Sequence, residues 1–207
     1  MTHRLTATIT LMVAMLMDLM DSTITNVALP AISTDLGATP TQLEWTLVGY
    51  VVAFATLLIT GGRLGDIYGR KRIFLVGVIG FTCASVFASL AWSGNALITA
   101  RIIQGAFAGV MVPQVLSSVQ VMYTPEERGP VFGIIGSLNA LGVIAGLLLG
   151  GWLVTANLFG TGWRSIFLIN VPVGVVLTVM AFLCIPYDWT SLVRPLAPRP
   201  SSSSFSL

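Results

Sequence analysis

The stretch of sequence that decides the fold runs from Gly62 to Arg72 and reads GRLGDIYGRKR. It lies between two long apolar runs, at roughly 45–60 and 73–92. Each run is long enough to cross a bilayer, and a short loop rich in Arg and Lys between two spans lies on the cytoplasmic side. The stretch therefore predicts a transmembrane hairpin with a cytoplasmic turn. Asp66 and Arg70 lie four residues apart and can pair if the segment is helical.

The whole chain has the composition of an integral membrane protein. Of its 207 residues, 55% are hydrophobic and 9% are charged, and the mean hydropathy is +0.90. Soluble proteins carry about 25% charged residues. Transmembrane barrels are built from short alternating segments, a pattern that this sequence lacks. We therefore expect an all-α, polytopic membrane protein embedded in a lipid bilayer, with no nucleic acid as a partner.

Six spans are predicted, at roughly 5–29, 45–60, 73–92, 96–122, 131–155 and 166–186. The spans form one transmembrane bundle, 1–186. The segment that follows, 187–207, is rich in Pro and Ser and shows no apolar periodicity. Such a composition predicts a disordered tail.

The distribution of basic residues predicts the orientation of the bundle. If the N-terminus is inside, Arg164 falls on the outer side and Arg101 falls within a span. The other eight of the ten basic residues fall on the inner side: Arg4, Arg63, Arg70, Lys71, Arg72, Arg128, Arg194 and Arg199. An excess of Arg and Lys marks the cytoplasmic side. We therefore expect a multi-pass protein of the cell (inner or plasma) membrane with both termini in the cytoplasm.

The first predicted span carries two carboxylates. On a helix, Asp18, Asp21, Ser22 and Thr25 share one face, and Asn26 follows. A charge in hydrocarbon costs at least ~2.5–3.5 kcal/mol, so this face is expected to point into the bundle or a water-filled cavity. Burial disfavours the charged form of a carboxylate and a bound cation favours it, which is the physical basis of proton/cation antiport. The alternative is a structural, hydrogen-bonded carboxylate or, for Asp18, a group that merely borders water.

Arg101 is the other charge inside a predicted span, and Gln104 follows it on the same helix face. Arginine stays protonated, so it needs a carboxylate or carbonyl partner there. Pairing with Asp21 or Asp18 across the bundle is one interpretation. Extension of the side chain to the outer interface is the other.

Glycines and prolines predict how the helices pack and where they bend. Gly142, Gly146 and Gly150 recur every four residues, and Gly151 follows. They form a smooth strip that allows another helix to approach closely. This strip is interpreted either as a simple packing surface or as a hinging interface. Pro30 is expected to end the first span. Pro113 predicts a kink in the fourth span, and Pro172 marks the start of the last.

The sequence offers little material for an enzyme site. Cys83 and Cys184 are far apart in apolar runs, and the single histidine is His3. One chain therefore cannot build a histidine-based metal site or a catalytic triad. We expect no enzyme activity, no metal and no cofactor.

These segments together resemble the major facilitator superfamily, specifically its fourteen-span drug:proton antiporters. The resemblance covers essentially residues 11–186. It rests on four motifs: Gly62-x-Leu64-x-Asp66-x-x-Gly69-Arg70-Lys71; Leu97-x-x-x-Arg101-x-x-Gln104-Gly105; Asp21-Ser22-Thr23-Ile24-Thr25-Asn26-Val27-Ala28-Leu29-Pro30; and Trp163-Arg164 with Phe167, Asn170, Pro172 and Gly174. Ile67 stands where a basic residue is usual. The antiporter motif of the fifth span is only partly present, because Leu147 stands where proline is usual.

The resemblance implies a fold of two six-helix halves that rock against each other around a substrate site. This chain matches the N-terminal six-span half. The implied function is export of hydrophobic or cationic drug-like compounds in exchange for protons, with Asp21 and Arg101 in proton transfer and the Asp66, Arg70 and Lys71 loop as a cytoplasmic gate. We interpret the chain as a truncated half. Two alternatives remain open: a half-size protein that works as a homodimer or with a separate C-terminal half, and a non-transporting remnant that binds a full-length transporter.

Overall fold

The computed structural model describes residues 2–156 and 160–185, and all the regular structure within them is helical. The elements are α1 (Thr2–Leu36), α2 (Pro40–Tyr68), α3 (Arg70–Ser89), α4 (Gly94–Met122), α5 (Pro125–Ala156), the 3-10 turn η2 (Gly162–Arg164), α6 (Ser165–Leu168) and α7 (Asn170–Cys184). Six segments of this described part are long and apolar enough to cross a membrane, the last running from Gly162 to Cys184. The predicted all-α, six-span fold is confirmed, whereas the predicted tail, 187–207, lies outside the described residues.

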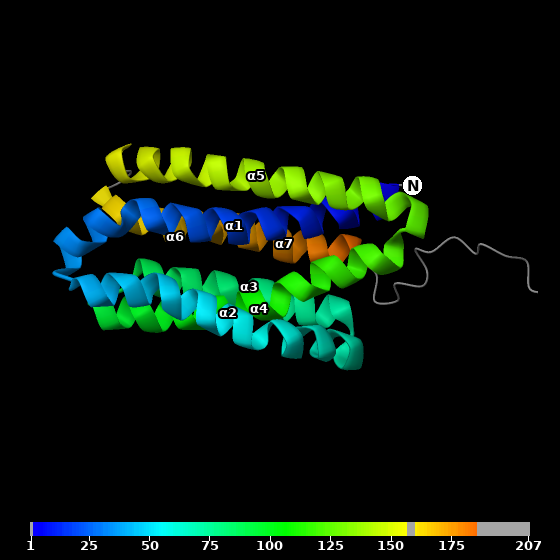
Figure 1. Ribbon diagram of the computed structural model, residues 1–207, viewed down its shortest axis with the longest axis horizontal. Helices are drawn as coiled ribbons and strands as arrows, with labels where there is room; N and C mark the ends of the chain where they lie inside the picture. The colour runs from blue at the N-terminus through cyan, green and yellow to red at the C-terminus, as the bar shows by residue number, and fades with distance from the viewer. Residues whose placement is uncertain (1, 157–159, 186–207) are drawn as a thin grey trace, which may run out of the picture.

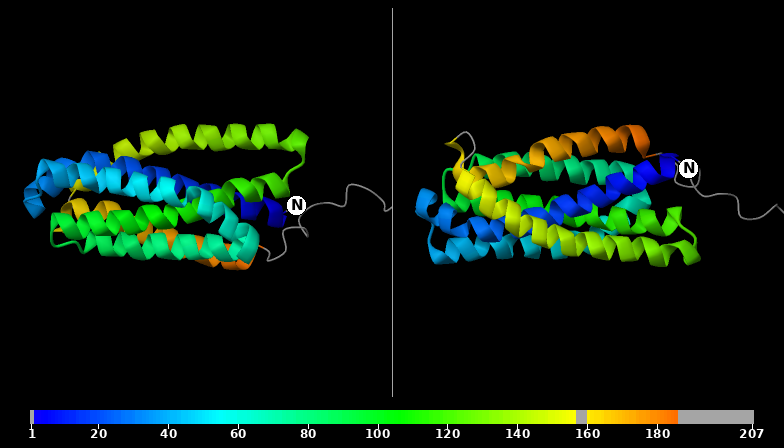
Figure 2. Two further views of the ribbon diagram at one scale, coloured as in Figure 1. Left: turned by 60° about the horizontal axis from the view of Figure 1, so that its bottom comes forward. Right: turned by 90° about the horizontal axis from the view of Figure 1, so that it is seen from above.

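The long helices run side by side along one axis, and their connections alternate between the two ends of the bundle (Figure 1). The start of α1, the α2–α3 turn, the α4–α5 turn and the end of α7 lie together at one end. The opposite end carries the α1–α2 and α3–α4 connections, the end of α5 and the start of α6 (Figures 1 and 2). Helix α2 packs chiefly on α4, and α5 packs chiefly on α1.

Short polar signals set several helix boundaries. Thr39 and Gln42 form a capping box at the start of α2, and Ser93 accepts a hydrogen bond from the backbone N–H of Ala96 at the start of α4. Gly69 separates α2 from α3 with a φ of 93°, in the left-handed region that glycine adopts without strain.

The helices extend beyond the predicted spans at several ends. Pro30 lies inside α1, which continues to Leu36, so the expectation that it ends the helix is wrong. A proline removes one backbone hydrogen bond, and a long, well-packed helix can absorb that loss. The basic stretch is also helical up to Tyr68, and only Gly69 interrupts it. The predicted loop is therefore a sharp corner between two helices.

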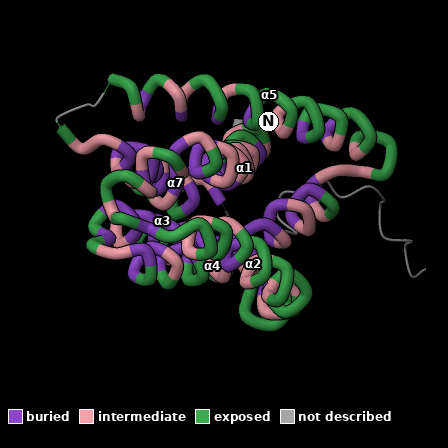
Figure 3. Tube along the Cα trace, turned by 60° about the vertical axis from the view of Figure 1, so that its left-hand side comes forward, coloured by how far each residue is buried: buried purple, intermediate pink, exposed green. Residues whose placement is uncertain are grey.

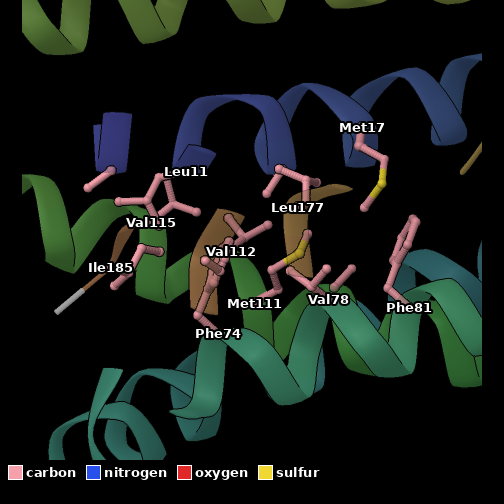
Figure 4. Packing of buried hydrophobic residues seen from close by; sticks show 14 of the residues in the cluster. Leu11, Met17, Phe74, Val78, Phe81, Met111, Val112, Val115, Leu177 and Ile185 are labelled. Carbon is pink, nitrogen blue, oxygen red and sulfur yellow. The ribbon is translucent and has the colours of Figure 1, made fainter. Parts of the chain in front are cut away.

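Two large hydrophobic clusters, and a small one of Val119, Val131 and Ile135, form the core of the described residues. The first contains Leu11 and Met17 of α1 and faces α3, α4 and α7 (Figure 4). The second contains Ile24 and Ile32 of α1, with partners from α3, α4, α5 and α6. Along α1, the polar residues Asp18, Asp21, Ser22 and Thr23 lie between these two clusters. The core is therefore interrupted at the level of the predicted carboxylates.

Much of the apolar surface lies on the outside of the bundle. Large hydrophobic residues are exposed along α5 and α7, among them Ile134, Leu148, Val176 and Leu183, and α5 shows exposed residues along its outer side (Figure 3). A soluble protein would bury such surface, whereas lipid is as apolar as these side chains. The exposed apolar faces agree with a protein that spans a membrane.

Salt bridges tie segments together at both ends of the bundle. At one end Asp35 accepts hydrogen bonds from the Trp163 indole (2.9 Å) and the Arg164 guanidinium (2.6 Å). At the other end Arg4 pairs with Glu127 (2.5 Å) and covers the Tyr123 ring. Partly exposed pairs of this kind contribute little to stability. These pairs connect α1 to the η2 turn at one end and to α5 at the other, and they add little to the stability of the fold.

Candidate functional site

Asp21 is the centre of a buried polar cluster between the two hydrophobic clusters. Its carboxylate accepts hydrogen bonds from Arg101 Nη1 (2.5 Å), Gln104 Nε2 (2.9 Å) and Asn170 Nδ2 (2.5 Å). The Asp21 and Arg101 side chains are each 1% exposed. Arg101 therefore pairs with a carboxylate across the bundle and does not extend to the outer interface.

The cluster continues to α3 through Ser85. Gln104 Nε2 donates to Ser85 Oγ (2.8 Å), and Asn170 Nδ2 lies 3.4 Å from the same atom. Gln104 Oε1 in turn accepts a second hydrogen bond from Arg101 (2.7 Å). Side chains from α1, α3, α4 and α7 thus meet at one point, and the hydrogen bonds of each depend on the others.

Asp18 belongs to the same region but has different partners. The Tyr50 hydroxyl of α2 donates a hydrogen bond to Asp18 Oδ1. The Arg101 guanidinium lies over the Tyr50 ring, 4.1 Å from its centroid, and Arg101 Nε donates to the Thr46 backbone oxygen (3.4 Å). The Tyr50 ring therefore connects Asp18 to the cation that pairs with Asp21.

Hydrogen bonding is complete where this cluster is enclosed. Among the described residues, no fully enclosed side-chain polar atom of Asp18, Asp21, Tyr50, Arg101 or Gln104 lacks a partner. Buried polar groups left unpaired cost free energy, and a satisfied network specifies one arrangement of its helices. The cluster can therefore hold charge at mid-span, where isolated charges are unfavourable.

Sequence reasoning missed Tyr50, Ser85 and Thr46 as members of this cluster, and it noted Asn170 only within a motif. Ser85 and Thr46 resemble ordinary helix residues, because their hydroxyls also bond to their own helix backbone. Asn170 was the clearest available signal, since an amide within an apolar span needs a polar partner.

One predicted site residue stays apart from the cluster. Asn26 is exposed, and its amide donates to the backbone oxygen of Ser22 (2.9 Å) on its own helix. Asp21 and Asn26 are five residues apart, which turns their side chains to different sides of α1.

The predicted gating loop forms a second polar site at the α2–α3 corner. Arg70 pairs with Asp66 (3.1 Å) and donates to the Ser117 backbone oxygen of α4 (3.3 Å). Lys71 is buried, donates to the Phe182 backbone oxygen (2.9 Å) and lies 5.4 Å from the centroid of the Phe182 ring. The corner between Gly62 and Lys71 is therefore tied to α4 and to the last turn of α7.

The α5 glycines pack against α1 beside the cluster. A Cβ atom at Gly142 would lie 2.8 Å from Leu16, one at Gly146 would lie 2.9 Å from Thr23, and one at Gly150 would lie 3.3 Å from Ile24. Gly151 faces open space and takes no part in this close approach.

An apolar cavity of about 130 Å³ lies next to the cluster, between α1 and the α6–α7 segment. Asn170 contributes to its wall, and the other lining residues are Val13, Leu16, Met17, Met20, Ile24, Ile169 and Val173. Asn170 therefore contacts both a hydrophobic space and the Asp21 carboxylate. In the described ranges, no three His, Cys, Asp or Glu side chains gather as metal ligands would.

The amino-acid sequence is similar to those of known proteins over most of its length. A family model described as Major Facilitator Superfamily matches residues 11–205. A "Probable actinorhodin transporter" of Streptomyces coelicolor is 50% identical over 182 residues, which is 88% of this chain and 31% of the relative. A puromycin resistance protein of Streptomyces alboniger is 38% identical over 181 residues, 87% of this chain and 35% of the relative. The chain thus spans about a third of the length of these curated relatives.

Solved structures show the same helical arrangement. A proton:xylose symporter superposes with a TM-score of 0.75 at 15% identity, over 92% of this chain and 46% of the symporter. A bacterial homologue of the lysosomal transporter Spinster superposes with a TM-score of 0.70 at 20% identity, over 96% of this chain and 46% of the homologue. At these identities the likeness concerns the fold alone, and the chain corresponds to half of that fold.

Proposed function

Because the chain belongs to the major facilitator superfamily, a family of membrane transporters rather than enzymes, we propose that it forms the proton-coupling half of an exporter of hydrophobic or cationic compounds. The observation that carries the proposal is the mid-span cluster of Asp21, Arg101, Gln104 and Asn170 with Asp18 beside it. Two features support the substrate class: relatives named for actinorhodin transport and puromycin resistance, and an apolar cavity against Asn170.

The geometry suggests how a proton can act on the helices. The cluster joins α1 to α4 and α7 through hydrogen bonds to one carboxylate. Charge-assisted hydrogen bonds are roughly twice as strong as neutral ones, so a change of charge in this cluster changes how firmly the helices are joined. A proton moving inward can draw ~2.3 kcal/mol from each 100 mV of membrane potential. That energy can drive export of a substrate against its gradient.

The corner around Gly62, Asp66, Gly69, Arg70 and Lys71 supplies a place for a gate in this proposal. We place this corner, together with both termini, on the cytoplasmic side. A test of this orientation is to introduce a cysteine at the exposed position Ile67 and to label it from either side of the membrane. Bonds from Arg70 to α4 and from Lys71 to α7 hold the corner closed against the bundle. Their release would let the cytoplasmic end of α2 move.

The alternative candidate is a non-transporting partner of a longer transporter. A test is accumulation of a lipophilic cationic dye in cells that express this chain alone, a C-terminal half from a relative alone, or both. The proposal predicts lower dye accumulation when both are present, because the substrate site lies between two halves. A chain that never lowers accumulation with any second half, yet co-purifies with an intact transporter, would instead be the interaction partner.

A further inference from the structure

The two intramembrane carboxylates of α1 have unequal sets of hydrogen-bond donors. Asp21 accepts from a cation and two amides, namely Arg101, Gln104 and Asn170. Asp18 accepts only from the neutral Tyr50 hydroxyl among the hydrogen bonds of the described residues. Donors that bond to the charged form of a carboxylate favour that form. The Asp21 carboxylate therefore has three hydrogen-bond donors, one of them a cation, whereas that of Asp18 has one neutral donor.

Protonation of Asp21 would also disrupt the bond that holds Arg101. The two groups lie 2.5 Å apart and are each 1% exposed. Removing the charge of one partner of a buried pair leaves the other uncompensated, which is strongly unfavourable. Asp21 is thus suited to hold Arg101 in place through the cycle rather than to exchange its proton.

The surroundings of Asp18 differ from those of Asp21 in exposure and in the charged groups nearby. It is 8% exposed, more than Asp21 at 1%, and it lies one helical turn from the Asp21 charge. The titratable or charged groups that face it are Tyr50 from α2, Arg101 from α4 and Asp21 from its own helix. Two carboxylates that share a site do not both ionise easily. Because Arg101 bonds directly to Asp21, the proton is better accommodated on Asp18.

We infer that Asp18, not Asp21, is the carboxylate that binds and releases the transported proton, and that Tyr50 is the positioning residue that links this event to Arg101. The inference rests on the proposed proton-coupled function. A proton from water adds to a carboxylate oxygen of Asp18 and returns to water on release, and Tyr50 keeps its own proton throughout. When Asp18 is neutral, its hydrogen bond from Tyr50 loses its charge assistance, and the Tyr50 ring beneath Arg101 is less firmly held.

Infrared difference spectroscopy of the purified chain with isotopically labelled aspartate tests this assignment without substrate or gradient. The wild type is expected to show a protonated-carboxyl band that grows as pH falls, and Asp18→Asn is expected to lose it. Tyr50→Phe should move the midpoint of the band up by as much as about one pH unit, because the anion loses a donor. Tyr123→Phe is the matched control: that phenol bonds to Thr8 at one end of the bundle, so the midpoint should stay in place.

The complementary variant is Asp21→Asn, which should retain the band. If this variant does not fold, the double variant Asp21→Asn with Arg101→Gln takes its place. It removes both charges of the buried pair and should retain the band. If the band persists in Asp18→Asn and disappears in the double variant, the assignment of the proton to Asp18 is wrong. If the midpoint of the band does not move in Tyr50→Phe, the role given to Tyr50 is wrong. Failure of dye export with the predicted titration intact would count against the proposed function and leave the proton site standing.

Discussion

Arg101→Met is expected to lower the free energy of unfolding by about 3–5 kcal/mol, the range for removing one partner of a buried ion pair. Asp21 would keep two amide donors but would lose its only cation, in a site that is 1% exposed. Methionine has a similar length, so the loss would reflect charge more than packing. The measurement is thermal unfolding of the purified chain in detergent, followed by tryptophan fluorescence.

The chain supplies a control for this experiment in a partly exposed arginine–aspartate pair. Arg164 and Asp35 lie 2.6 Å apart, but their side chains are 32% and 47% exposed. Arg164→Met is expected to cost about 0–1 kcal/mol, because exposed pairs contribute little. Adding Asp21→Asn to Arg101→Met should recover part of the loss by removing the unpaired charge. Equal unfolding temperatures for Arg101→Met and Arg164→Met would contradict the account of the cluster.

Gly105→Ala is expected to separate α2 from α4. A Cβ atom at Gly105 would collide with the backbone oxygen of Tyr50, and one at Gly109 would lie 2.5 Å from the backbone oxygen of Phe54. Backbone atoms cannot turn aside as a side chain can, so α2 must shift. Because Tyr50 and Thr46 both contact Arg101, the shift should reduce export as well as stability.

Gly151→Ala is the matched control for Gly105→Ala. Its Cβ would meet nothing within 4 Å, and alanine favours a helix over glycine by about 1 kcal/mol. The control should therefore unfold at the same temperature or higher, while Gly105→Ala unfolds at a clearly lower one. Equal or raised unfolding temperatures for both variants would show that the close approach of α2 and α4 tolerates a methyl group.

The sequence could predict much of the cluster because charges in hydrocarbon permit few arrangements. Asp21 and Arg101 each needed a buried partner, and helical spacing turned Asp18 and Asp21 to one face. These constraints led to the six-span fold and to the pairing across the bundle. They did not decide which carboxylate Arg101 would choose, because that depends on how deeply each helix lies in the bundle.

The parts that were missed depend on tertiary contacts that leave no periodic signal. Tyr50 lies in an apolar span and reads as an ordinary aromatic residue until α4 brings Arg101 over its ring. Pro30 is a strong local signal for a helix end, yet α1 continues past it to Leu36, with Ala28 before it and Ile32 after it buried in the core. The helical course of the basic stretch up to Tyr68 was likewise hidden, because Gly65 packs against α4 instead of forming a loop: a Cβ at Gly65 would collide with the Gln114 side chain.

The central claim is that this chain couples substrate export to protons, and the most direct test is dye uptake into everted membrane vesicles that contain the chain with a C-terminal half. An imposed pH gradient, acidic inside, is the only driving force, and an ionophore that exchanges protons for potassium collapses it. The account predicts uptake that starts with the gradient, stops when the gradient collapses, and is absent in vesicles carrying Asp18→Asn. Uptake that continues unchanged after the gradient has been collapsed would contradict proton coupling.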